Sequence, residues 1–188
     1  TLGATTGFGG ILVSNEYDTE ANQGKLTFSA KVTCIPANAF KSSTISTISI
    51  PNTVKEIGND AFRESNISEI TIPDNVTTMG TYVFYDCNSL VSANIGNSVT
   101  SIGEHAFYHC NILETVSIGN GVTSIGYCSF EYCSALKTVS IGNGVTSIGE
   151  SAFFCCDNLV TIKIQRRLQV IYSGGALLFA SVPGMMAD

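Results

Sequence analysis

Two histidines stand four residues apart in the segment Glu-His-Ala-Phe-Tyr-His-Cys at positions 104–110. On a helix this spacing would put the imidazoles of His105 and His109 on one face, beside Glu104 and Cys110, and these residue types are the usual ligands of zinc. This spacing is only a weak indication of a metal site, because a structural zinc site needs four ligands. Related segments elsewhere in the chain also carry unrelated residues at the two histidine positions. We therefore expect no metal and no cofactor.

The chain has seven cysteines, and four of them recur every 23 residues: Cys87, Cys110, Cys133 and Cys156. Ser43 and Ser65 take the same place earlier in the chain, which indicates a small core position that faces inward. Neighbouring parallel strands would hold these side chains about 4.8 Å apart, whereas the Cβ atoms of a disulfide lie about 3.8 Å apart. We expect the four thiols to be buried and reduced. The other cysteines, Cys34, Cys128 and Cys155, fall at other phases, where we expect more exposure.

Other kinds of chemistry lack their motifs in this sequence. There is no G-x-S-x-G, H-E-x-x-H, G-x-x-x-x-G-K-[ST] or G-x-G-x-x-G pattern, so we expect no enzymatic activity. The formal charge of −6 leaves no basic surface for phosphates, and we expect no nucleic-acid partner. The longest apolar stretch, from Ala176 to Ala187, is far shorter than the roughly 20 residues of a membrane span.

The elements that position all these residues follow an internal repeat. Six phenylalanines recur at intervals of 22, 22, 23, 23 and 23 residues: Phe40, Phe62, Phe84, Phe107, Phe130 and Phe153. Self-similarity at such a period is typical of solenoids, in which each unit buries its apolar face against its neighbours. We expect the six phenylalanines to form a ladder in the core.

Each unit has a strand, a turn and a second short extended stretch. In one unit, residues 116–118 alternate apolar and polar side chains, which predicts a short strand with its polar side chains facing out. The following Gly-Asn-Gly predicts a turn, since Gly and Asn tolerate positive φ. Around each ladder phenylalanine we expect one short helical or 3₁₀ turn.

The units resemble BspA-type leucine-rich repeats. The resemblance is carried by successive matching units, and the three clearest are residues 99–118, 122–141 and 145–164. The first of them reads V-T-S-I-G-E-H-A-F-Y-H-C-N-I-L-E-T-V-S-I. It covers roughly residues 26–171. It implies a solenoid of short parallel strands, found on surface and secreted proteins of bacteria and of some parasitic protists, with adhesion or host-protein binding as its role and no catalytic residues.

The termini are expected to depart from the repeat. We expect residues 1–23 to form an irregular N-terminal cap, residues 24–172 to form about seven coils, and residues 173–188 to be either a C-terminal cap or a tail. Leu26 and Phe28 keep the repeat spacing, so the first coil should begin near Gly24. The chain begins at Thr1 rather than Met, which suits a mature or trimmed chain.

Two surfaces are candidates for binding. The outward positions of successive strands carry mostly hydroxyls, with Thr115, Ser117, Thr138 and Ser140 at the centre and Glu114 and Lys137 beside them. They can bind a partner, or they can simply solvate a sheet. Aromatic residues around the ladder phenylalanines, among them Tyr108 and Tyr132, form a second candidate contact patch.

We expect the protein to be a non-enzymatic interaction module, extracellular or on the cell surface, that binds a protein or glycan through one face of the solenoid. Two alternatives stay open. One is a structural spacer that holds another domain away from a surface. The other is an intracellular protein–protein scaffold, which seven thiols without clear pairing in the sequence would favour.

Overall fold

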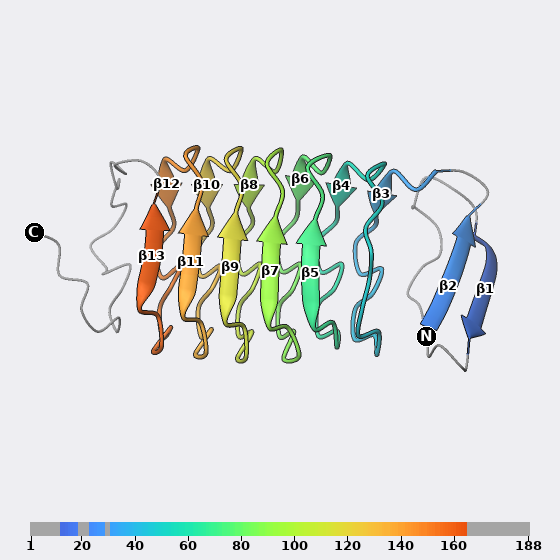
Figure 1. Cartoon of the computed structure of the whole chain (residues 1–188), viewed down its shortest axis with the longest axis horizontal. Helices are drawn as coiled ribbons and strands as arrows, with labels where there is room; N and C mark the ends of the chain where they lie inside the picture. The colour runs from blue at the N-terminus through green and yellow to red at the C-terminus, as the bar shows by residue number, and fades with distance from the viewer. Residues whose placement is uncertain (1–11, 19–22, 29–30, 165–188) are drawn as a thin grey trace, which may run out of the picture.

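The computed structural model describes residues 12–18, 23–28 and 31–164, and the part from residue 31 onward is a stack of six coils. The long sheet has five parallel strands: β5 (Glu69–Ile72), β7 (Ser92–Ile95), β9 (Thr115–Ile118), β11 (Thr138–Ile141) and β13 (Thr161–Ile164). Two short sheets share a second row of parallel strands: β3 (Cys34–Ile35), β4 (Glu56–Ile57) and β6 (Thr78–Met79), then β8 (Ser101–Ile102), β10 (Ser124–Ile125) and β12 (Ser147–Ile148). Figure 1 shows the two rows running along the stack, one in front of the other. The predicted solenoid of short parallel strands is confirmed.

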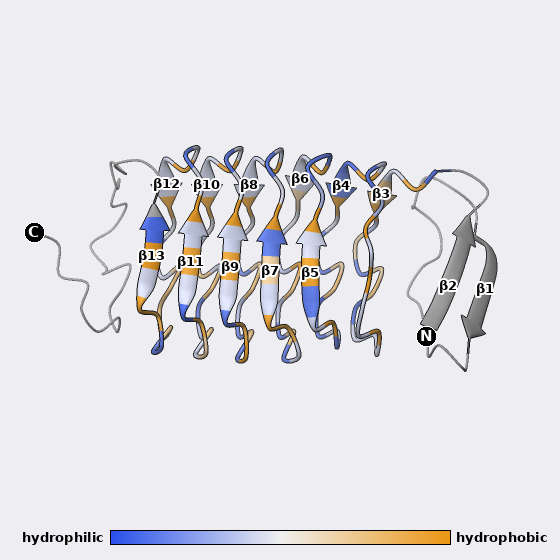
Figure 2. Ribbon diagram, in the orientation of Figure 1, coloured by the Kyte–Doolittle hydropathy of each residue, from blue (hydrophilic) through white to orange (hydrophobic). Residues whose placement is uncertain are grey.

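The strands pair so that equivalent residues of neighbouring coils lie side by side. Thr115 pairs with Thr138, and Val116 pairs with Val139. Because side chains alternate along a strand, β9 buries Val116 and Ile118 and exposes Thr115 and Ser117. Figure 2 shows the result as polar and apolar bands that alternate along each strand of the long sheet.

The core is built from ladders of identical side chains. The six ladder phenylalanines stack ring on ring, with centroids 4.9–5.3 Å apart and ring planes within 19° of parallel. Such offset stacking adds to the free energy gained by burying the rings. Ladders of Val, Ile and Leu complete the interior, for example Leu90, Leu113, Leu136 and Leu159.

The segments around the ladder phenylalanines are not helical turns, and the described residues contain no helix. In the coil of Phe107, the backbone N–H groups of His105, Phe107 and His109 donate to carbonyls of the next coil at 2.7–3.0 Å. The intervening Tyr108 and Cys110 N–H groups donate back to His105 and Phe107 within the coil. The segment is therefore a third hydrogen-bonded ladder between coils.

This ladder depends on left-handed backbone at two positions of every coil. The residues two before and two after each ladder phenylalanine have φ between 50° and 60°: Asn38, Ser42, Asp60, Glu64, Tyr82, Asp86, His105, His109, Cys128, Tyr132, Ser151 and Cys155. None of the twelve is glycine, although left-handed backbone disfavours side chains with a Cβ. The two left-handed positions of each coil are four residues apart. This is the same spacing that suggested a helix for His105 and His109.

The glycines of the Gly-Asn-Gly turns have a different role from the one predicted. Gly119 and Gly121 do not have positive φ. Instead, a Cβ on Gly119 would lie 2.5 Å from the carbonyl oxygen of Gly96, and one on Gly121 would lie 2.0 Å from that of Asn97. Glycine is needed here because the backbones of successive coils approach closely.

The N-terminal segment also differs from the expectation. β1 (Leu12–Asp18) and β2 (Gln23–Phe28) pair antiparallel, with Leu12 opposite Phe28 and Asn15 opposite Leu26. Residues 12–18 are therefore a strand, with a shift of register between Leu12 and Ser14, and Leu26 and Phe28 belong to a hairpin rather than to a first coil. The alternating pattern that suggested a coil suits either kind of strand. The predicted cap or tail at 173–188 lies outside the described residues.

Candidate binding surfaces

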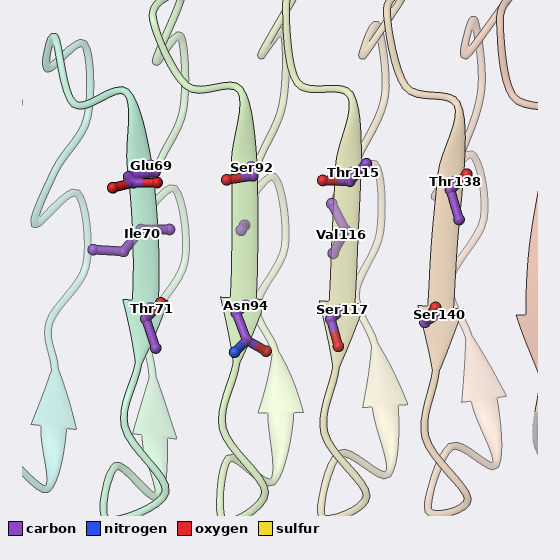
Figure 3. Close-up of a pocket in the computed structure, with 11 residues that line it drawn as sticks. Glu69, Ile70, Thr71, Ser92, Asn94, Thr115, Val116, Ser117, Thr138 and Ser140 are labelled. Atoms are coloured by element: carbon purple, nitrogen blue, oxygen red, sulfur yellow. The ribbon is translucent and has the colours of Figure 1, made fainter.

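The outward side of the long sheet forms a polar surface with a hollow at its centre. The hollow has a volume of about 270 Å³, and it is lined mainly by outward residues of four neighbouring strands, β5, β7, β9 and β11, with Ile70, Ala93 and Val116 at its floor. Figure 3 shows their side chains in rows across the strands, including Thr115, Ser117, Thr138 and Ser140. We call this surface the hydroxyl face.

The hydroxyl face is nearly free of net charge at its centre. Hydroxyls and the Asn94 amide lie between Glu69 on β5 and Lys163 on β13, and both of these charged residues are exposed. Beside the strands, the Lys137 Nζ lies 2.9 Å from Glu114 Oε1, which neutralises the predicted flanking charges. Both side chains are about half exposed, so the pair adds little stability. The surface therefore suits a polar, uncharged ligand.

A second surface runs along the turn segments of coils three to six, counted by their ladder phenylalanines. Its members are aromatic side chains in contact with one another, and we call them the aromatic strip: Tyr82, Tyr85, His105, Tyr108, His109, Tyr127, Tyr132 and Phe154. Tyr85 stacks on Tyr108 with centroids 5.0 Å apart, and Tyr132 meets Tyr108 edge-on at 5.6 Å. Tyr127 and Tyr132 are 45% and 38% exposed. The strip presents aromatic surface to solvent, although its rings are well ordered by mutual contact.

The two histidines belong to this strip and do not act as a pair. The His105 ring stacks on Tyr82 at 4.8 Å, whereas His109 Nδ1 is hydrogen-bonded to Asp86 of the preceding coil. Their left-handed backbone removes the helical face that would have brought them together. Within the described ranges, no group of three or more His, Cys, Asp or Glu side chains could hold a metal ion.

The four ladder cysteines are buried free thiols that also make a hydrogen bond. Each Sγ donates to the carbonyl oxygen of the preceding coil's ladder phenylalanine, as from Cys133 to Phe107, at 3.0–3.1 Å. Burial raises the pKa of Cys87 and of Cys156 to about 12, and it raises that of Cys110 as well. Cys87, Cys110 and Cys156 are therefore protonated donors at neutral pH and not nucleophiles.

The three remaining cysteines do not share one environment. Cys34 and Cys155 are half-buried, whereas Cys128 is buried and is a free thiol, contrary to the expectation that all three would be more exposed. Burial, with a contribution from Glu131, raises the pKa of Cys128 to about 12.

One contact of the aromatic strip was not expected from the sequence. The guanidinium carbon of Arg63 lies 4.6 Å from the centre of the Tyr85 ring. Arg63 occupies the position after its ladder phenylalanine, 22 residues before Tyr85 in the next coil. Aligning the units by their phenylalanines would have placed the two side chains next to each other.

The chain matches the family model described as BspA type leucine rich repeat region over residues 12–116 and 112–176, in six copies. A comparison with curated protein sequences gave no significant match. No helix among residues 12–18, 23–28 and 31–164 is long and apolar enough to cross a membrane.

Solved structures with the same fold come from bacteria. A leucine-rich repeat protein of T. pallidum superposes with a TM-score of 0.69 at 23% identity, covering 81% of this chain and 80% of that one. A leucine-rich cell surface protein of Faecalibacterium prausnitzii A2-165 superposes with a TM-score of 0.56 at 24% identity, covering 81% of this chain. This chain spans only 53% of the F. prausnitzii chain. At these identities the likeness establishes the fold.

Proposed function

Because the chain belongs to the BspA-type leucine-rich repeat family, we propose that it is a non-catalytic interaction module, secreted or displayed on a cell surface, that binds a protein or glycan on its hydroxyl face. The F. prausnitzii protein of the same fold is a cell surface protein, which supports the location. The observation that carries the proposal is the hollow of about 270 Å³ whose lining includes Thr115, Ser117, Thr138 and Ser140.

The chemistry of this face defines the ligand class. Strands in register repeat the same hydroxyl positions from coil to coil, so the face offers donors and acceptors at regular intervals. Hydroxyl and amide groups bind sugars and peptide groups without the desolvation cost of a buried charge. A rigid β-scaffold holds these groups in place before binding, which lowers the entropic cost of association.

The test uses the double variant Thr115→Lys/Ser140→Lys, which places two lysines on the hydroxyl face. The two residues lie diagonally to each other on neighbouring strands. The matched control, Ser101→Lys/Ser147→Lys, adds the same charge to the second row of strands, on β8 and β12. Each protein is applied to a glycan array and to wells coated with extracellular matrix proteins. We expect binding by the wild type and the control, and at least about tenfold weaker binding by the hydroxyl-face variant.

Two outcomes would overturn the proposal. If the wild type binds and both variants bind equally well, the hydroxyl face is not the site. If the wild type binds none of the probes, the spacer function is favoured instead. Protease treatment of intact producing cells tests the location, because a surface-displayed chain is digested and an intracellular scaffold is protected.

A further inference from the structure

The aromatic strip has an internal example of how it accommodates a positive charge. The Arg63 guanidinium lies over the Tyr85 ring, and Asp60 and Glu64 hold it there at 3.2 Å each. A cation over a tyrosine ring and between carboxylates is a stabilising arrangement, because the ring face carries negative electrostatic potential. The strip is thus occupied by a cation at its N-terminal end.

Further along the same column, which ends at Phe154, a tyrosine ring and a carboxylate recur without the cation. The position after the ladder phenylalanine holds Arg63, Tyr85, Tyr108 and Glu131 in successive coils. Glu131 lies close enough to Tyr108 to raise the pKa of that phenol further, in addition to the larger effect of burial. In the described part of the chain, Glu131 makes no ion pair, whereas Asp60 and Glu64 both pair with Arg63.

The charge balance of these coils favours a positively charged partner. Between residues 82 and 156 the sequence has one Lys or Arg, Lys137, and it pairs with Glu114 away from the strip. The same stretch has four further carboxylates: Asp86, Glu104, Glu131 and Glu150. Glu104 and Glu150 are exposed and occupy the same repeat position as Tyr127, one coil before it and one coil after it. Asp86 is paired with His109, whereas Glu104 and Glu150 make no ion pair with the residues that the structure describes, so exposed carboxylates and the Tyr127 ring alternate along this surface.

We propose that the aromatic strip is a second binding surface, independent of the hydroxyl face, and that it binds a basic peptide segment of a partner protein. An Arg or Lys side chain of the peptide lies against Tyr108 and Tyr132 and pairs with Glu131, as Arg63 lies against Tyr85 between its own carboxylates. Further cationic side chains reach Glu104 and Glu150 in the neighbouring coils. A neutral glycan, which also stacks on tyrosine, would make no use of these carboxylates.

Fluorescence anisotropy with a labelled peptide of alternating Arg and Gly tests the proposal, with Gln–Gly and Glu–Gly peptides as controls. We expect binding of the Arg peptide alone. Tyr132→Ser should weaken this binding about five- to thirtyfold, because a cation–π contact and its desolvated surroundings are lost. Tyr132→Phe keeps the ring and should bind within about twofold of the wild type. Thermal unfolding of each variant shows whether the fold is retained, and Tyr108→Ser and Tyr108→Phe provide a second pair.

The net charge of the chain could attract an Arg peptide without any specific site, so a charge-matched control is needed. Glu131→Gln and Glu56→Gln each remove one negative charge, but Glu56 is exposed on β4 in the second row of strands. We expect the first change to weaken binding at least about fivefold and the second to leave it within twofold. The proposal is wrong if the two changes act equally, if Tyr132→Ser has no effect, or if the Gln peptide binds as tightly. Thr115→Lys/Ser140→Lys should leave peptide binding unchanged, which separates this site from the hydroxyl face.

Discussion

Removing one ring from the phenylalanine ladder should cost more than an average core truncation. Phe107 is completely buried and stacks on Phe84 at 4.9 Å and on Phe130 at 5.0 Å. We expect Phe107→Ala to lower the free energy of unfolding by about 3–5 kcal/mol, because it leaves a cavity whose walls are two rigid rings. Within this loss, each stacked pair contributes about 0.5–1.5 kcal/mol beyond the burial of area.

Phe107→Leu separates the stacking from the burial. Leucine keeps most of the apolar volume but loses both ring contacts, so we expect a smaller loss of about 1–3 kcal/mol. Urea unfolding followed by circular dichroism measures both variants, with the m-value as a check that the unfolding transition is comparable. Double-mutant cycles then test the ladder itself. Phe107 and Phe130 should couple by more than about 0.5 kcal/mol, whereas Phe107 and Phe62, separated by Phe84, should be nearly additive.

The ladder would be refuted as the source of stability by a loss below about 1 kcal/mol for Phe107→Ala. Equal coupling for the neighbouring and the separated pairs would also contradict it. That result would mean that the coils respond to truncation as one body, rather than through contacts between neighbouring coils as expected for a solenoid.

Three further predictions concern the cysteines. The ladder thiols, such as Cys133, should react with a thiol reagent only after unfolding, while Cys155 reacts in the native state; rapid labelling of Cys133 in the folded protein would contradict their burial. The free energy of unfolding should fall as the pH rises from about 9 towards 12. The expected slope is about 1.4 kcal/mol per pH unit for each of Cys87 and Cys156. The cause is their raised pKa values, which keep the folded thiols protonated while the unfolded chain releases the protons. This contribution is complete below pH 9, and alkaline urea titrations of Cys87→Ala/Cys156→Ala should show a shallower slope. Cys155→Gly should raise stability by about 1 kcal/mol, since Cys155 has φ of 56°, and a lower melting temperature would refute this.

The cross-section of a coil could be predicted from the sequence because identical residues face the same neighbours in every coil. The alternation of Thr115, Val116 and Ser117 gave the strand and its exposed side, and the period placed Phe107 beside Phe84 and Phe130. In a stack of parallel coils, one unit therefore defines the register of all the others.

Local backbone geometry could not be predicted in the same way. Left-handed backbone is usually inferred from glycine, asparagine, aspartate or histidine, and Tyr82, Tyr132 and Cys155 give no such signal. The backbone N–H groups of Tyr82 and Tyr132 donate to carbonyls of the next coil, and these tertiary contacts are not visible in the local sequence. The hairpin of β1 and β2 was missed for a related reason, since alternating side chains do not reveal whether a strand pairs parallel or antiparallel.

The same geometry explains why the candidate surfaces are harder to recognise than the fold. Each coil contributes one residue to each outward column, so a contact such as Arg63 on Tyr85 joins residues 22 positions apart that share no local motif. The consensus of the repeat, which averages over the coils, removes this information. The order in which the coils follow one another determines which ring lies beside which charge. Deleting the coil of Phe107 would bring Tyr85 next to Glu131 without changing any core ladder, so the fold could be retained while the aromatic strip is rearranged.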